Sequence, residues 1–68
     1  MAKFEPGDQV YLQDNDKRYY GIVLEHRDSD GEFVPVRFYD NVGGCTCGGR
    51  GPNGHCMYVL PYDLRKAR

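Results

Sequence analysis

The residues best suited to chemistry gather in one glycine-rich stretch, residues 43–56, which holds all three cysteines and one of the two histidines. Thiolates and imidazoles are the ligands that structural zinc sites favour, and a Cys₃His set supplies the four that Zn²⁺ needs. One hypothesis is therefore a structural zinc ion bound by Cys45, Cys47, His55 and Cys56. His26 would replace His55 if the second predicted strand ends near this stretch.

Two other interpretations fit the same stretch. In one, Cys56 pairs with Cys47 or Cys45 in a disulfide and leaves a spare thiol, although the odd cysteine count and a cytosolic setting argue against it. In the other, the thiols stay reduced in a mobile loop, whose Gly-Gly-Arg-Gly run acts as a flexible contact arm through Arg50. Six of the twelve residues from 43 to 54 are glycine, so ordering this loop costs much conformational entropy.

Catalysis finds little support in the sequence. A neighbouring Cys-His pair can act as nucleophile and base, yet no third group in this stretch would orient the histidine. The carboxylates of Asp14, Asp16, Asp28 and Asp30 stand in turn-like clusters, where Asp is common because its side chain bonds the local backbone. The sequence therefore predicts a protein that is not an enzyme.

Alternating apolar and polar residues predict a small all-β domain. A 3₁₀ turn is expected at residues 61–63, and Asp28-Ser29-Asp30-Gly31 predicts a hairpin loop. Gly21 lies inside a strand pattern that is apolar on both sides, which is typical of a sharp bend where backbones approach closely. The expected strands are residues 9–13, 19–25, 33–39, 57–60 and 64–67.

The alternation also predicts which side chains share a face. Val10 and Leu12 should lie on one face of the first strand and Tyr11 on the other. In the third strand the proline at position 35 should occupy an edge or a bulge, because it cannot donate to the sheet. We expect a common core that contains Val10, Ile22, Val36 and Leu64.

Length and composition limit the architecture to one domain, residues 4–68. A 68-residue chain buries only about 60% of the surface that it exposes when unfolded, so its stability should be modest. No apolar run approaches the roughly 20 residues needed to cross a bilayer, and the N-terminus has no apolar signal-peptide core. We expect a cytoplasmic protein without membrane contact.

The charge is distributed unevenly. Residues 1–42 carry five Lys or Arg against nine Asp or Glu, a balance of −4, while residues 43–68 carry four against one, a balance of +3. Strong nucleic-acid binders usually show a marked basic excess, because counterion release supplies much of their affinity. Here such an excess is confined to the loop and the C-terminal tail.

Four short motifs, taken in order, resemble the pattern of SH3-like small barrels, and of Tudor domains in particular. They are Gly7-Asp8-x-Val10, Tyr20-Gly21-x-Val23, Val36-Arg37-Phe38-x-Asp40 and Leu60-Pro61-x-Asp63-Leu64. The resemblance covers most of the chain and implies a five-stranded barrel. The stretch 43–56 would then be a long loop inserted between the third and fourth strands.

The resemblance to Tudor domains also implies a place for a ligand. In Tudor domains that bind methylated lysine or arginine, four aromatic side chains form a cage around the cation. Tyr20 and Phe38 fall on two of these cage positions, whereas Asp14 and Asn41 fall on or near the other two.

These patterns together predict a binding module whose favoured ligand is a partner protein, contacted through aromatic side chains at the barrel rim. The predicted rim residues are Tyr11, Tyr19, Tyr20, Phe38 and Tyr39. The alternative is nucleic-acid binding, as in the related KOW-type barrels. Its residues would be Arg37, Arg50, Arg65, Lys66 and Arg68. A third hypothesis is a small assembly protein whose long loop docks onto a larger complex or a second copy of itself.

Overall fold

The structure is a computed structural model that describes residues 4–67. Its elements are β1 (Gln9–Asp14), β2 (Lys17–Val23), η1 (Asp28–Asp30), β3 (Val34–Phe38), β4 (Cys56–Val59), η2 (Pro61–Asp63) and β5 (Leu64–Lys66), where η denotes a 3₁₀ helix. All five expected strands are present, with ends shifted by one or two residues. No helix in this part of the chain is long and apolar enough to cross a membrane.

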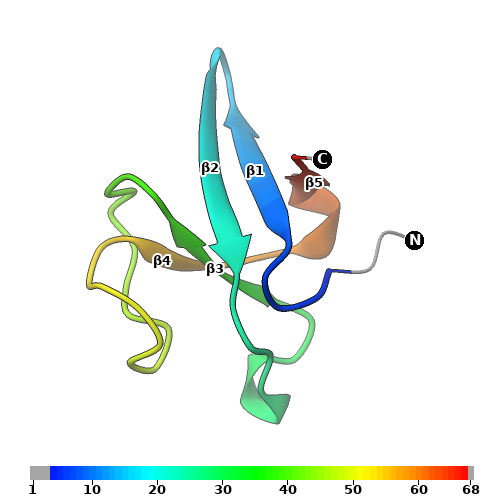
Figure 1. The fold of residues 1–68 in the computed structure, drawn as a ribbon, viewed down its shortest axis with the longest axis vertical. Coiled ribbons are helices and arrows are strands. Elements are labelled where there is room, and N and C mark those ends of the chain that lie inside the picture. The colour runs from blue at the N-terminus through cyan, green and yellow to red at the C-terminus, as the bar shows by residue number, and fades with distance from the viewer. Residues whose placement is uncertain (1–3, 68) are drawn as a thin grey trace.

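The five strands form one antiparallel sheet in the order β4-β3-β2-β1-β5. The sheet curls strongly, so that β1 and β2 rise from it as a long hairpin while β3 and β4 cross beneath (Figure 1). This arrangement is a half-barrel, which confirms the all-β prediction. Residues 39–55, the connection between β3 and β4, lie on the side of the molecule away from β5 (Figure 1).

The hairpin between β1 and β2 has a tight turn. Asp14 pairs with Lys17, which leaves only Asn15 and Asp16 in the turn. Asn15 has φ 55°, in the left-handed region that asparagine tolerates better than most residues. The polar residues on either side therefore extend the two strands instead of ending them.

The core lies on the concave face of the sheet. Val10 and Val36 are fully buried there, and Leu12 and Tyr19 pack against them from the hairpin. Ile22 is a correction to the expected core: it pairs with Gln9 and Arg37 on the outer face and is only half-buried. The buried core residues are Val10, Val23, Val36, Phe38, Val59 and Leu64.

The backbones of β2 and β3 approach each other closely at Gly21. Gly21 pairs with Phe38, and a Cβ atom at Gly21 would lie 2.5 Å from the carbonyl oxygen of Arg37 and 2.9 Å from Cα of Phe38. Both neighbours are backbone atoms, which cannot rotate away. The expected close approach of backbones at this glycine is thus confirmed, with β3 as the partner.

The two 3₁₀ helices link strands that must change direction. At η2, which coincides with the expected turn, Pro61 begins the helix and the chain then returns so that Leu64 pairs with Leu12. The expected hairpin loop at residues 28–31 does connect β2 to its antiparallel neighbour β3, and it contains η1, which ends at Gly31 with φ 60°. Pairing of β5 with β1 places the C-terminal strand at the edge of the half-barrel opposite β4.

Replacing Gly21 with alanine tests the close approach of the two backbones. Because the added methyl group would overlap backbone, Gly21→Ala should lower the free energy of unfolding by about 3 kcal/mol. Gly49→Ala is the matched control, since nothing lies within 4 Å of its Cβ position and only its φ of 85° is strained, which costs about 1 kcal/mol. Urea titrations measure both. An equal loss in the two variants would contradict the close approach.

Candidate functional site

Three tyrosines form a row across the outer face of the sheet. Tyr11 of β1 pairs with Tyr20 of β2, and their ring centroids are 5.5 Å apart with planes tilted by 43°. The backbone N–H of Tyr39, just past the end of β3, donates to the carbonyl of Tyr20 at 3.0 Å. Tyr39 therefore lies beside Tyr20, on the side away from Tyr11. We call Tyr11, Tyr20 and Tyr39 the tyrosine row. Tyr20 is 43% exposed and Tyr39 is 61% exposed.

Guanidinium groups flank one end of the tyrosine row. The Arg18 guanidinium lies 4.9 Å from the centroid of the Tyr11 ring, a cation–π distance. Hydrogen bonding to Tyr20 raises the pKa of Arg18, with the charges of Tyr11 and Tyr20 as further causes. Arg65 of β5 pairs with Tyr11 from the other side. This surface therefore offers phenol rings and positive charge together.

The other two predicted rim residues face the core. Phe38 is 1% exposed and belongs to the buried cluster, so it cannot contact a partner, and its assignment to the rim is corrected. Tyr19 packs partly buried against the same cluster, with Lys17 Nζ 5.1 Å from its ring centroid. Since Tyr20 lies on the outer face and Phe38 on the core face, these two do not form the walls of a common cage.

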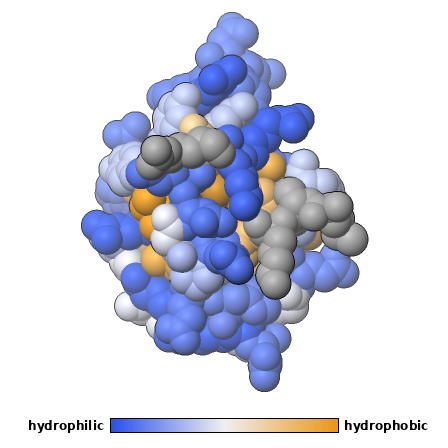
Figure 2. All heavy atoms as spheres, turned by 45° about the vertical axis from the view of Figure 1, so that its right-hand side comes forward, coloured by the Kyte–Doolittle hydropathy of each residue, from blue (hydrophilic) through white to orange (hydrophobic). Residues whose placement is uncertain are grey.

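On the face shown in Figure 2, the surface is mainly hydrophilic, with hydrophobic residues visible only in small patches around the middle of the view. Among the described residues, the large aromatic side chains that reach solvent are tyrosines and one phenylalanine. A tyrosine carries a hydroxyl that stays hydrated while its ring makes contacts, which suits a surface that must remain soluble and still bind. The exposed set is Tyr20, Phe33, Tyr39, Tyr58 and Tyr62.

The glycine-rich loop folds back along β4. Cys45 and Cys56 form an antiparallel bridge, in which Cys45 N–H donates to the Cys56 carbonyl at 2.6 Å and Cys56 N–H to the Cys45 carbonyl at 3.1 Å. The N–H groups of Val42 and Gly44 both donate to the carbonyl of Gly54. The expected flexible contact arm is therefore tied to the sheet by its own backbone.

Arg50 fixes the tip of this loop. Its guanidinium makes two hydrogen bonds to Asp30, from Nη1 to Oδ2 at 2.9 Å and from Nη2 to Oδ1 at 3.0 Å. It also donates from Nε to the Cys47 carbonyl at 2.6 Å, to the Glu25 carbonyl, and to the Tyr58 hydroxyl at 3.2 Å. The side chains of Arg50 and Asp30 are only 9% and 2% exposed. Arg50 is thus a structural residue, which corrects its assignment to a free contact arm or a phosphate contact.

Arg50 and Asp30 each favour the charged form of the other. The hydrogen bond from Arg50 lowers the pKa of Asp30 to about 2, with a second hydrogen bond from the backbone of Arg27 acting in the same direction. The hydrogen bond to Asp30 in turn raises the pKa of Arg50. Sequence reasoning placed Asp30 only as a turn residue, because 20 positions separate it from Arg50 and no local pattern links the two.

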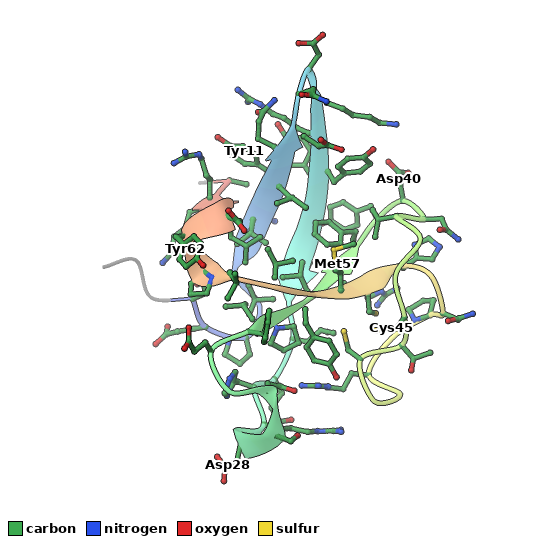
Figure 3. The ribbon with its side chains drawn as sticks, turned by 180° about the vertical axis from the view of Figure 1, so that it is seen from behind. Tyr11, Asp28, Asp40, Cys45, Met57 and Tyr62 are labelled. Atoms are coloured by element: carbon green, nitrogen blue, oxygen red, sulfur yellow. The ribbon has the colours of Figure 1, made fainter. Side chains whose placement is uncertain are left out.

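The three cysteines carry free thiols that differ in exposure. Cys45 is exposed, whereas Cys47 and Cys56 are fully buried. Cys45 Sγ lies 3.9 Å from Cys47 Sγ and accepts the N–H of Cys47 at 3.3 Å. Burial raises the pKa of the Cys47 thiol to about 12, and burial also raises that of Cys56. Figure 3 shows Cys45 in the loop beside β4, well away from Tyr11 and Tyr62.

The hypothesis of a zinc site at Cys45, Cys47, His55 and Cys56 gains no support from the geometry. Within residues 4–67, no three or more His, Cys, Asp and Glu side chains are arranged to hold a metal ion. His55 Nδ1 lies 3.3 Å from the Phe38 carbonyl oxygen, and His26 Nε2 lies 2.9 Å from that of Gly31. Each histidine thus directs a ring nitrogen at a backbone carbonyl.

The basic residues proposed to contact nucleic acid are scattered. Arg37 is exposed on the outer face two residues before Tyr39, and Arg65 is exposed beside Tyr11. Lys66 Nζ lies 3.5 Å from Asp8 Oδ2, in a partly exposed ion pair. Arg50 is buried, and Arg68 lies outside the described residues. Two of the five, Arg37 and Arg65, therefore border the tyrosine row.

Comparisons with known proteins return no match: no family model, no curated protein and no solved structure matches the chain.

The burial of two thiols gives a chemical prediction. Under native conditions iodoacetamide should alkylate Cys45 first, whereas Cys47 and Cys56 should react at least about 100-fold more slowly, because their reaction requires the loop to open. In guanidinium chloride all three should react at similar rates. Mass spectrometry of the digested protein assigns the sites. Native alkylation of Cys56 as fast as that of Cys45 would show that the loop does not cover β4.

The Arg50–Asp30 pair predicts a specific pH dependence. Asp30 has an ordinary pKa of 3.8 and a folded value of about 2, so its contribution to stability is fully present above about pH 4 and is lost as pH falls toward 2. Asp30→Asn should therefore lower the melting temperature most at neutral pH, and the gap from the unsubstituted protein should close toward pH 2.

Asp28→Asn is the matched control, because Asp28 is an exposed carboxylate in the same 3₁₀ turn. Its substitution should change the melting temperature little at any pH between 2 and 7. A constant gap for Asp30→Asn over this range would contradict ion-pair stabilisation by Arg50.

Proposed function

We propose that this domain is a non-enzymatic binding module that takes a partner protein on the tyrosine row. The observation that carries the proposal is the alignment of Tyr11, Tyr20 and Tyr39 across neighbouring strands of an exposed face, with Tyr20 and Tyr39 largely accessible. Tyrosine and arginine are the residues most enriched at protein interfaces, and both occur here in contact.

The rigidity of the tyrosine row also supports a role in binding. Each tyrosine stands on a backbone position fixed by sheet hydrogen bonds, and Tyr11 is further held between Tyr20 and Arg18. Side chains that are already ordered lose little entropy on association, so more of their contact energy appears as affinity. A partner that presents carboxylates near an apolar segment would complement the guanidinium groups of Arg18 and Arg65.

We also propose a specific fold class for this domain. We take the half-barrel to be SH3-like and similar to Tudor domains, with residues 43–56 as the insertion. Support comes from the meander of β1 to β4, from the single 3₁₀ turn before β5, and from the pairing of β5 with β1. Folds of this kind carry many unrelated functions, so the proposed activity depends on the surface and not on the fold.

Capture experiments with matched tyrosine variants test the proposed surface. Immobilised domain should retain a protein from nuclease-treated extract of the source cells, and Tyr20→Ala and Tyr39→Ala should each weaken that capture. Truncating a central interface aromatic costs about 2 kcal/mol, roughly a 30-fold loss of affinity.

Tyr62→Ala is the control, since Tyr62 is 74% exposed but lies in η2, outside the row. Its capture should match that of the unsubstituted domain, and circular dichroism should be the same for all four proteins. If Tyr62→Ala weakens capture of the partner as much as Tyr20→Ala, the tyrosine row is not the binding surface. The same conclusion follows if all three variants capture the partner as well as the unsubstituted domain.

Nucleic-acid binding is the second candidate, favoured by one observation. Arg37 and Arg65 are exposed on the same face as the tyrosine row, and aromatic rings beside arginines are a stacking platform for unpaired bases. A labelled mixed-sequence single-stranded oligonucleotide should then bind and lose affinity steeply between roughly 50 and 200 mM salt. Binding that is absent, or insensitive to salt, would exclude this candidate. The third hypothesis, an assembly protein that docks through its loop, has no observation that favours it.

A further inference from the structure

The loop brings an exposed thiol and a buried thiol into contact. Cys45 is exposed and Cys47 is fully buried, yet their sulfur atoms are 3.9 Å apart and Cys47 N–H donates to Cys45 Sγ. A disulfide requires the sulfurs to be about 2 Å apart. A modest movement of the loop would therefore join Cys45 to Cys47.

The surrounding backbone permits that movement. Gly43 and Gly44 precede the pair and Gly48 and Gly49 follow it, and three of these four glycines already have positive φ. Glycine adopts such conformations without steric cost, so the segment between them can adjust. Cys56, by contrast, is part of β4 and is held by pairing with Arg37 of β3.

Two pairings compete with it, Cys47 with Cys56 and Cys45 with Cys56. The first would join two thiols that are both fully buried and out of reach of an oxidant in solution. Cys45 and Cys56 are less well placed than Cys45 and Cys47. Cys45 and Cys56 oppose each other in an antiparallel bridge with hydrogen bonds in both directions. In such hydrogen-bonded pairs the Cβ atoms are about 5.5 Å apart, whereas a disulfide needs roughly 3.5–4.5 Å. Forming this bond would require the strand pairing at the base of the loop to break.

We propose that Cys45 and Cys47 are a reversible oxidation site that reacts with low-molecular-weight disulfides. The Cys45 thiolate attacks one sulfur of the small disulfide, forms a mixed disulfide and releases one thiolate. The released thiolate takes the proton of Cys47, whose sulfur then attacks the Cys45 sulfur, closes the Cys45–Cys47 bond and expels the second small thiolate, which takes a proton from water. Two protein thiols are oxidised, and one small disulfide is reduced to two thiols.

The different exposures of Cys45 and Cys47 determine which thiol reacts first. Cys45 is the only one of the three that an oxidant in solution reaches directly. Burial raises the pKa of Cys47 to about 12, so this thiol stays protonated while it is buried and reacts second, once the loop has moved it toward Cys45. A disulfide that spans one residue is strained, and strained, exposed disulfides are readily reduced again.

Oxidation would also disturb the contacts of Arg50 that hold the loop in place. The carbonyl of Cys47 accepts the hydrogen bond from Arg50 Nε, and Arg50 holds Asp30. Moving Cys47 out of its buried position toward Cys45 therefore pulls on the contact that fixes the loop to η1. The site is independent of the proposed partner surface, since the tyrosine row lies on β1, β2 and the end of β3.

Tryptic cleavage separates the pairings without any substitution. Cleavage after Arg37, Arg50 and Arg65 places Cys45 and Cys47 together in the peptide 38–50 and Cys56 alone in 51–65. The folded protein is equilibrated with reduced and oxidised glutathione at fixed ratios, quenched with acid, alkylated and digested.

The expected product is the unlinked peptide 38–50 without alkyl groups, about 2 Da lighter than the unmodified dithiol peptide, whereas reduced protein gives the doubly alkylated peptide; dithiothreitol before alkylation should restore the latter. It should exceed any 38–50/51–65 cross-link by at least about tenfold. A dominant cross-link would overturn the proposal, and so would a peptide 38–50 that stays reduced while the same protein oxidises in guanidinium chloride.

Two variants complete the test. Cys45→Ser should abolish the intramolecular bond and leave Cys47 reduced, because the exposed sulfur that starts the exchange is gone. Cys56→Ala should still give the oxidised 38–50 peptide. Loss of oxidation in Cys56→Ala, with circular dichroism unchanged, would transfer the role to Cys56 and overturn the assignment.

Discussion

The partly buried hydrogen bonds between Arg50 and Asp30 are the interaction on which the position of the glycine-rich loop depends. They join two long connections, β2–β3 and β3–β4, that would otherwise be separate loops. The guanidinium also binds the carbonyls of Glu25 and Cys47, so one side chain satisfies several backbone acceptors at once. A planar donor with five N–H groups can do this, and lysine cannot. The cysteines keep their contrasting exposures because this contact holds the loop down.

The curl of the sheet gives it two faces with different roles (Figure 1). The concave face gathers Val10, Val36 and Phe38 into the core, and the outer face is left for tyrosines and arginines. A small domain has too few apolar residues to bury both faces of a sheet. The aromatic rings on the outer face are therefore available for contacts, and the strand pairing that stabilises the fold also fixes their spacing.

Local pattern predicted the strands well because strand alternation is a short-range property. The placement of Val10 and Leu12 on one face, the close backbone approach at Gly21 and the 3₁₀ turn at residues 61–63 all follow from neighbours within a few positions. Phe38 and Ile22 show the limit of this reasoning. A strand that is apolar on both sides does not reveal which side the rest of the chain will cover, and only the curl of the sheet decides it.

The sequence by itself determined an antiparallel β-domain with a glycine-rich, cysteine-bearing insertion, because backbone preferences and apolar spacing are written in consecutive residues. Only the tertiary structure decided what the insertion does. Contact between Arg50 and Asp30, the burial of Cys47 beside an exposed Cys45, and the alignment of Tyr11, Tyr20 and Tyr39 each join residues from different elements. Such contacts depend on how strands are registered and how loops fold back over them, and no local spacing encodes that geometry.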